Sequence, residues 1–250
     1  MSIPRENSEP ETAKPREYFA TTQWTLVLNA GRSESTSARE ALAQLCQSYW
    51  YPLYAYARRR GNLPEDAEDL TQGFFTRLLE LNSLARVRRD KGKFRSFLLA
   101  SLNHYLSDEW DRDRAQKRGK GRIISLDANV AEERLSREPA DALTPEKLFE
   151  RKWAMTLLES VVQKLQREYD SAGKAALFRA LKFGVGGEPA DKSYAELSSQ
   201  LGLSEPTLRV AIHRLRRRYR ELLREEIART VASEAEVDGE IRHLFAALAG

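Results

Sequence analysis

The chain has 250 residues, of which 41% are hydrophobic and 31% charged, so it is long enough for one large or two small globular domains. Its formal net charge of +4 and its isoelectric point of about 9.1 favour a polyanionic partner. A single cysteine, Cys46, excludes an internal disulfide framework and a cysteine-cluster zinc site.

The start of the chain is rich in proline, glutamate and serine and offers almost nothing to bury. We predict a disordered tail over residues 1–19. The tail lacks the apolar stretch of a secretory leader, and no segment approaches the roughly 18 apolar residues that span a bilayer. We therefore expect a cytoplasmic protein with no membrane span.

A dense apolar pattern runs from Trp24 to about Trp110 and lacks the alternation typical of strands. We therefore predict a helical domain over residues 20–116. It begins with a short helix in the stretch ATTQWTLVLNAG. A longer helix follows over about residues 37–60, in which Pro52 should cause a kink or a break.

The segment LPEDAEDLTQGFFTRLLEL is predicted to be a helix with Pro64 in its first turn, where a missing N–H costs nothing. Spacings of three and four residues place its apolar side chains on one face, made of Ala67, Leu70, Phe74 and Leu78. The opposite face is then acidic and polar, with Glu65, Glu68, Asp69 and Gln72. Such a face suits a basic partner. Acids in a first turn also complement the helix dipole, by about 0.3 to 1 kcal/mol each, without any partner.

A basic turn, ARVRRDKGK, precedes a long helix that opens at Phe94 and reads FRSFLLASLNHYLSDEWDRDRAQKR. Aromatic side chains beside cations suit unpaired nucleic-acid bases, which need stacking surfaces and phosphate partners. Plain core packing is the other interpretation, and we favour it for Phe97, Leu98 and Leu102.

Periodicity fades over residues 117–143, which change from basic (KRGKGR) to acidic (DANVAEERLSREPAD), so we predict a flexible linker. Helix returns at Thr144, a cap followed by proline. Its apolar residues at every fourth position are Phe149, Trp153, Leu157, Val161 and Leu165. The predicted fold is all-α, with two helical domains joined by the linker, the second over residues 144–226.

The stretch SYAELSSQLGLSEPTLRVAIHRLRRRYRELL has the pattern of a helix-turn-helix. Ser193 and Glu196 form a capping box, Gly202 allows a tight turn, and Ser204 caps a second helix. An αα-hairpin with a solvated basic face would show the same pattern. In a helix-turn-helix, base edges would be met by Glu205, Thr207, Arg209, Val210 and His213. Phosphates would be met by Arg214, Arg216, Arg217, Arg218 and Arg220.

These motifs together resemble a known family. SYWYPLYAYARRRGNLPEDAEDLTQGFFTRLLE and FRSFLLASLNHYLSDEWDR look like the second conserved region of bacterial RNA polymerase sigma factors of the extracytoplasmic-function (ECF) group. The helix-turn-helix stretch is similar to their fourth region. The resemblance covers roughly residues 24–114 and 153–225, in the family's order. One departure is Gly73, which stands where the family usually has glutamate.

The resemblance implies a role for each motif. A helix that docks on core RNA polymerase would use Asp66, Glu68, Asp69, Leu70 and Gln72. Recognition and opening of the minus-10 promoter element as single strand would use Arg95, Asn103, Asp108, Arg112 and Arg114, with Arg88, Arg89, Lys91 and Lys93 nearby for phosphates. The fourth region would read the minus-35 element as duplex, through Arg209, His213 and Arg214. A separate anti-sigma protein is a further partner that the resemblance suggests.

The C-terminal extension, residues 227–250, has no counterpart in the minimal family. Its apolar residues should either pack back on the fourth region or bind a partner helix; they are Ile241, Leu244, Phe245 and Leu248.

We expect a sigma factor that binds core polymerase and promoter DNA and directs DNA melting. The alternative is a stand-alone helix-turn-helix regulator whose first half is a sensor or dimerisation domain. No catalytic set, metal-ligand spacing or cofactor motif stands out, so we do not expect an enzyme, and we predict no cofactor.

Overall fold

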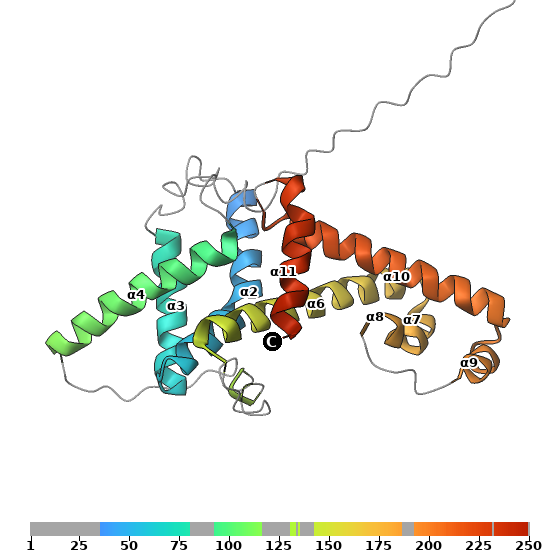
Figure 1. Ribbon diagram of the computed structural model, residues 1–250, viewed down its shortest axis with the longest axis horizontal. Coiled ribbons are helices and arrows are strands. Elements are labelled where there is room, and N and C mark those ends of the chain that lie inside the picture. Colours follow the sequence, from blue (N-terminus) through green and yellow to red (C-terminus); the bar gives the residue numbers. More distant parts are fainter. Residues whose placement is uncertain are drawn as a thin grey trace, which may run out of the picture.

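The structure, a computed structural model, describes residues 36–80, 93–116, 131–133, 135, 143–186, 193–231 and 233–249; within 36–47, 79–80, 112–116 and 186 it describes the helix backbone only. The predicted tail, the first short helix and the basic turn lie outside these residues. Every regular element of the described residues is helical (Figure 1). This confirms the predicted all-α class.

Helices α2 (Thr36–Arg59), α3 (Pro64–Glu80) and α4 (Phe94–Gln116) form the first group. Of the kink or break predicted at Pro52, the break does not occur, because α2 runs through this residue without interruption. A proline inside a helix costs about 3 kcal/mol. Pro52 is itself buried, and Leu53 and Tyr56 beside it are fully buried, so packing offsets that cost.

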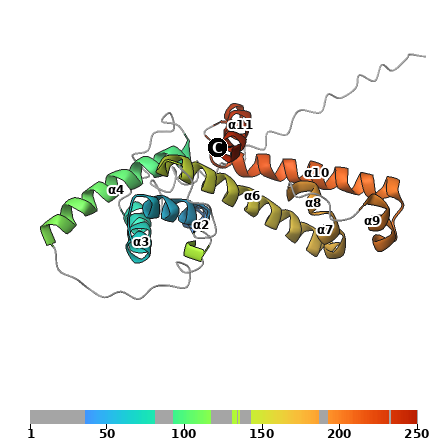
Figure 2. The same ribbon diagram turned by 60° about the horizontal axis from the view of Figure 1, so that its bottom comes forward.

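Helix α6 (Pro145–Ser171) crosses the middle of the molecule between this group and the later helices (Figures 1 and 2). Thr144 caps it by accepting a hydrogen bond from the Lys147 N–H at 3.3 Å. Its 27 residues span about 40 Å at 1.5 Å per residue. All the residues predicted at every fourth position are buried, so one stripe of α6 carries core contacts along its whole length.

The second group contains α7 (Ala175–Leu181), α8 (Phe183–Gly186), α9 (Tyr194–Leu201) and α10 (Glu205–Ala228). The predicted boundaries of the last helix pair are confirmed. Ser193 and Glu196 form both bonds of the capping box, Gly202 ends α9 with φ of 64°, and Ser204 accepts from the Thr207 N–H. These local signals depend on neighbours within a few residues, which is why the sequence reveals them.

The chain ends with the short helix η2 (Glu234–Glu236) and with α11 (Val237–Ala249). Helix α11 packs on α6 and α10, and Val237 and Leu244 are buried there. Of the two roles expected for the extension, packing back on the chain is therefore the one that the structure has. Phe245 remains 52% exposed.

One apolar cluster joins the two groups of helices. It runs from Tyr49 in α2 through Phe149 and Trp153 in α6 to Leu223 in α10 and Leu244 in α11. Part of the predicted linker also lies against the first group. Residues 131–133 are helical, and Glu132 accepts hydrogen bonds from Tyr54 and Arg58, each at 2.8 Å or less. The two groups therefore share a core through α6, and the predicted domain limits stay a prediction.

Candidate functional site

Helix α3 presents part of the predicted acidic face. Gln72 is exposed, while Asp66 and Asp69 are half-buried, and Leu70 packs partly against the core. Glu68 does not lie on the surface as expected, since only 4% of it is exposed, and its Oε1 accepts from Gln72 Nε2 at 3.0 Å. Because Glu68 is buried, the acidic face is narrower than the sequence predicted. Asp66, Asp69 and Gln72 lie at accessible positions of this face.

Gly73, in the middle of α3, has a packing reason that the sequence did not reveal. A Cβ added at this position would collide with the hydroxyl of Tyr105 in α4. The Tyr105 ring is held by Phe74, at a centroid distance of 6.0 Å, and by Arg77, whose guanidinium lies 5.7 Å from the ring centroid. A residue without a side chain lets α3 and α4 approach closely here.

The expected minus-10 residues of α4 are divided among several environments. The Tyr56 hydroxyl lies 2.7 Å from Asn103 Oδ1, so Asn103 has a partner within the protein. Asp108 is exposed and pairs with Arg77 at 3.1 Å. Trp110 is exposed by 57% near the far end of the helix. Side chains of Arg112 and Arg114 lie outside the described residues, as do Arg88, Arg89 and Lys91 entirely.

Arg95 and Lys93, at the start of α4, are neutralised within the protein. Arg95 is 5% exposed, and its Nε lies 2.7 Å from Glu240 in α11. It also pairs with Glu150 in α6 and lies over the Trp153 ring, 5.1 Å from the centroid. Lys93 pairs with the same Glu240. Acids from distant segments pair with Arg95 in this arrangement, and its contact with DNA stays a prediction.

Most of the predicted DNA-contacting residues of α10 do lie on one exposed side. The core side of the helix carries Leu208, Ile212 and Leu215. The exposed positions are Glu205, Thr207, Arg209, Val210, His213, Arg214, Arg216 and Arg217. Val210 is an apolar residue among these cations, and 48% of it is exposed instead of being buried in the core. The helix thus offers a cationic surface with one apolar contact at its centre.

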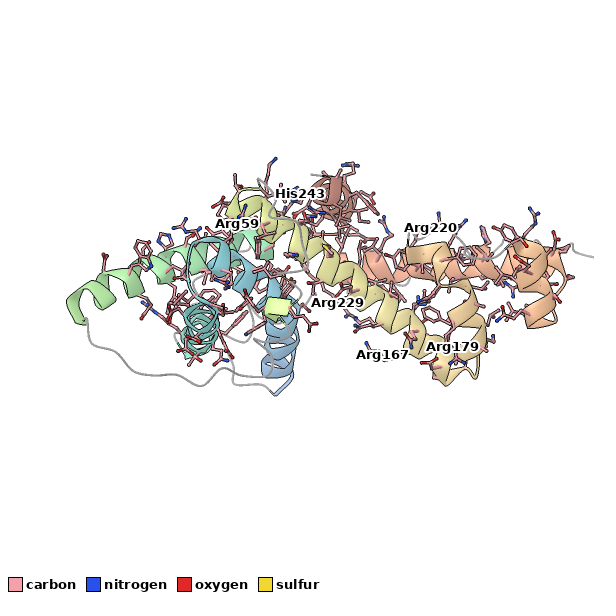
Figure 3. All side chains as sticks on the ribbon, turned by 90° about the horizontal axis from the view of Figure 1, so that it is seen from below. Arg59, Arg167, Arg179, Arg220, Arg229 and His243 are labelled. Carbon is pink, nitrogen blue, oxygen red and sulfur yellow. The ribbon has the colours of Figure 1, made fainter. Side chains whose placement is uncertain are left out.

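A groove of about 690 Å³ lies between α10 and the shorter helices α8 and α9. Its lining is cationic and aromatic, with Tyr194, Arg209, His213, Arg216, Tyr219 and Arg220 among its residues; Arg220 is labelled in Figure 3. The Arg209 guanidinium lies over the Tyr194 ring at 5.3 Å, and Arg216 Nε donates to the Gly184 carbonyl at 2.9 Å. Arg209 also lies 3.8 Å from the carboxylate of Glu205 in its own helix, so both arginines are held by contacts within the protein.

Arg218 has a different role from the other arginines. Its guanidinium donates to both carboxylate oxygens of Glu168 in α6, at 2.7 and 2.8 Å, and also lies near Glu221 and Glu225. The hydrogen bond to Glu168 is the main cause that raises the pKa of Arg218 above its ordinary value. The Arg218 guanidinium is paired with Glu168 of α6 in this structure, and its expected phosphate contact stays a prediction.

The match to known families is confined to the first group of helices. Residues 45–116 match the family described as Sigma-70 region 2, a segment that holds most of α2 and all of α3 and α4. Neither the curated proteins nor the solved structures contain a match to the chain. Within the part of the chain that the structure describes, no helix is long and apolar enough to cross a membrane.

Proposed function

We propose, from the match of residues 45–116 to Sigma-70 region 2, that the chain is a sigma factor of the ECF group that holds a promoter at two elements and opens it. The match itself supports a role in promoter recognition by RNA polymerase. The subgroup, the opening of DNA and the residue roles are the proposal. One combination supports the proposal: the same chain has a match to Sigma-70 region 2 and, in α10, an exposed cationic side.

Docking on core polymerase is assigned to α3. Asp66, Asp69 and Gln72 provide its accessible polar positions, and Leu70 remains partly accessible between them. Charge complementarity of this kind speeds encounter with a basic partner and sets its orientation. Glu68, being buried, contributes by holding Gln72 rather than by touching the polymerase.

Contact with single-stranded DNA is assigned to the outer part of α4. Exposed Trp110 offers a stacking surface for an unpaired base, and base–aromatic stacking is worth about 1 to 3 kcal/mol. Melting a promoter costs a few kcal/mol per unstacked base. Stacking of the unpaired bases on the protein offsets this cost, and no covalent step is needed. Arg112 and Arg114 follow Trp110 along the same helix and suit the phosphates.

Contact with duplex DNA is assigned to α10. Its first half carries Arg209, Val210 and His213 on the exposed side, at positions suited to base edges in a major groove. Further arginines, Arg214, Arg216 and Arg217, follow toward its middle and suit phosphates, which fix register but carry no sequence information.

The direct test mixes the full chain with purified bacterial core RNA polymerase and a library of random promoters. We expect co-purification with the core enzyme and transcripts that start from a shared sequence. Binding of the isolated chain to duplex DNA without any polymerase-dependent transcription would instead favour a stand-alone regulator. Co-purification from the native cell also tests for an anti-sigma protein.

The minus-35 assignment has a sharper test. Arg209→Ala with Arg214→Ala should abolish the shared upstream sequence in the selected promoters while co-purification persists. Arg167→Ala with Arg179→Ala, which removes two exposed arginines from α6 and α7, is the control matched for charge (Figure 3). An unchanged upstream preference in the double variant would show that α10 does not read DNA.

A further inference from the structure

The C-terminal extension makes an unusual contact with the start of α4. Glu240 of α11 is only 1% exposed and lies between Lys93 and Arg95, the two cations that flank Phe94. Burial by itself raises the pKa of the Glu240 carboxyl, but the hydrogen bonds from Arg95 and Lys93 outweigh it and hold that pKa below its ordinary value. The charged Glu240 carboxylate therefore pairs with both cations.

A second layer supports this pairing from α6. Glu150 pairs with Arg95 on one side and lies 2.9 Å from His243 Nε2 of α11 on the other. The His243 ring, labelled in Figure 3, has its centroid 6.3 Å from that of the Trp153 ring, and Arg95 lies over the same Trp153 ring. Each charge in the cluster has an opposite partner, which is the condition under which buried charges are tolerated.

Helix α11 is held by two kinds of contact. Val237 and Leu244 bury apolar surface against α6 and α10, so the helix is anchored to the second group. Helix α11 reaches the start of α4 through the ion pairs of Glu240 with Lys93 and Arg95. A backbone hydrogen bond from the Phe94 N–H to the Thr230 carbonyl, at 3.4 Å, adds a contact from the segment that precedes η2. Figures 1 and 2 show α11 over α6, at the inner end of α4. Charge competition can break the hold on α4 without removing the apolar anchor.

We infer that α11 is an autoinhibitory clasp, in which Glu240 takes the place of a nucleic-acid phosphate on Lys93 and Arg95 until α11 is displaced from α4. The inference rests on the proposed function. The same two cations continue the basic segment that precedes α4, and the resemblance assigns that segment to phosphates. Glu240 lies outside the part of the chain that matches the sigma-70 family, so the clasp is an addition to that core.

The test compares three full-length chains: wild type, Glu240→Gln and the control Glu234→Gln. Glu234 is exposed in η2, so its replacement removes the same charge from the same extension without touching α4. The probe is a fluorescein-labelled single-stranded DNA 20-mer of random sequence, since phosphate contacts are independent of sequence. Fluorescence anisotropy is measured between 50 and 200 mM KCl.

We expect Glu240→Gln to bind the probe at least about threefold more tightly than wild type at the lowest salt. The plot of log affinity against log salt should steepen by about 0.7 for each cation released. Lys93→Gln in the Glu240→Gln background should make that slope shallower again by about 0.7, because one of the two released cations is removed. Glu234→Gln should match wild type.

The outcomes separate the clasp from the sigma-factor proposal. If wild type binds the probe and Glu240→Gln binds with the same affinity and salt slope, the clasp is overturned. Absence of DNA binding in every chain, together with no transcription on core polymerase, would overturn the proposed function instead.

A measurement on unaltered protein covers the case in which Glu240→Gln does not fold. Hydrogen exchange of wild type should speed up in residues 237–249 when the probe is added, because nucleic acid displaces α11 from α4. Unchanged protection of α11 at saturating probe would overturn the clasp.

Discussion

Arg218 of α10 donates two hydrogen bonds to the carboxylate of Glu168 in α6, from Nε at 2.8 Å and from Nη2 at 2.7 Å. This pair connects the proposed DNA-reading helix to the helix that crosses the molecule. Its neighbour Arg217 is 73% exposed and donates to Glu221 of the same helix at 2.9 Å, with no ion pair to another helix among the described residues. Adjacent arginines of one basic run therefore serve different purposes.

The first prediction compares these neighbours. Arg218→Ala should lower the free energy of unfolding by about 1 kcal/mol, because it removes a bidentate pair that is still a third exposed. Arg217→Ala should change it by less than about 0.5 kcal/mol but should flatten the salt dependence of duplex binding by about 0.9. Urea unfolding and duplex anisotropy measure the two effects. Equal effects of both variants on the salt slope would contradict the division.

The second prediction concerns pH. The hydrogen bond from Arg218 holds the pKa of Glu168 below its usual value of 4.5. A carboxyl with a lowered pKa in the folded state contributes stability that is present above the unfolded pKa and lost as pH falls through the folded one. Wild type should therefore lose more stability below about pH 4.5 than Arg218→Ala does. Urea midpoints measured from pH 3 to 7 check this, and parallel curves would contradict it.

The third prediction concerns Gly73. An exposed glycine in a helix is usually stabilised by alanine, by about 1 kcal/mol. Gly73→Ala should give no gain or a loss, because the new Cβ meets the Tyr105 hydroxyl. In a Tyr105→Phe background, which removes the obstructing oxygen, the same substitution should regain much of the usual benefit. Thermal unfolding of the four chains in this cycle measures the coupling, and additive effects would exclude the collision.

The fourth prediction separates docking from folding on α3. Asp69→Arg should weaken co-purification with core polymerase at least about tenfold while circular dichroism and the thermal midpoint stay near wild type, since a rim charge acts mainly on the encounter. Glu68→Arg should instead destabilise the fold by about 3 kcal/mol or more, because it puts a longer side chain of opposite charge at a buried position and removes the acceptor of the Gln72 hydrogen bond. Normal core binding by a folded Asp69→Arg chain would contradict the docking assignment.

Much of the candidate site is visible in the sequence because its signals are local. Ser193, Glu196, Gly202 and Ser204 specify the ends of α9 and α10 through bonds that reach at most a few residues. The buried stripe of α6 follows from the helical period in the same way. Patterns of this range predict which side of a helix faces solvent, and for most arginines of α10 the structure agrees.

The exceptions arise where packing brings distant residues together. Glu68 has the spacing of a surface residue but is buried, and Pro52 lies in a helix that continues through it. Gly73 looks like a weak point in α3 until Tyr105 is seen beside it. Helix periodicity describes one helix at a time, so it cannot report what a second helix does to that face.

By itself, the amino-acid sequence determined the helical class, the caps and the two basic segments, because each depends on neighbours along the chain. The tertiary structure alone decided which cations are available to a partner. Glu168 lies 50 residues from Arg218, and Glu240 lies 145 residues from Arg95. An ion pair depends on separation in space, and across such distances in sequence only the packing of α6, α10 and α11 brings the charges together.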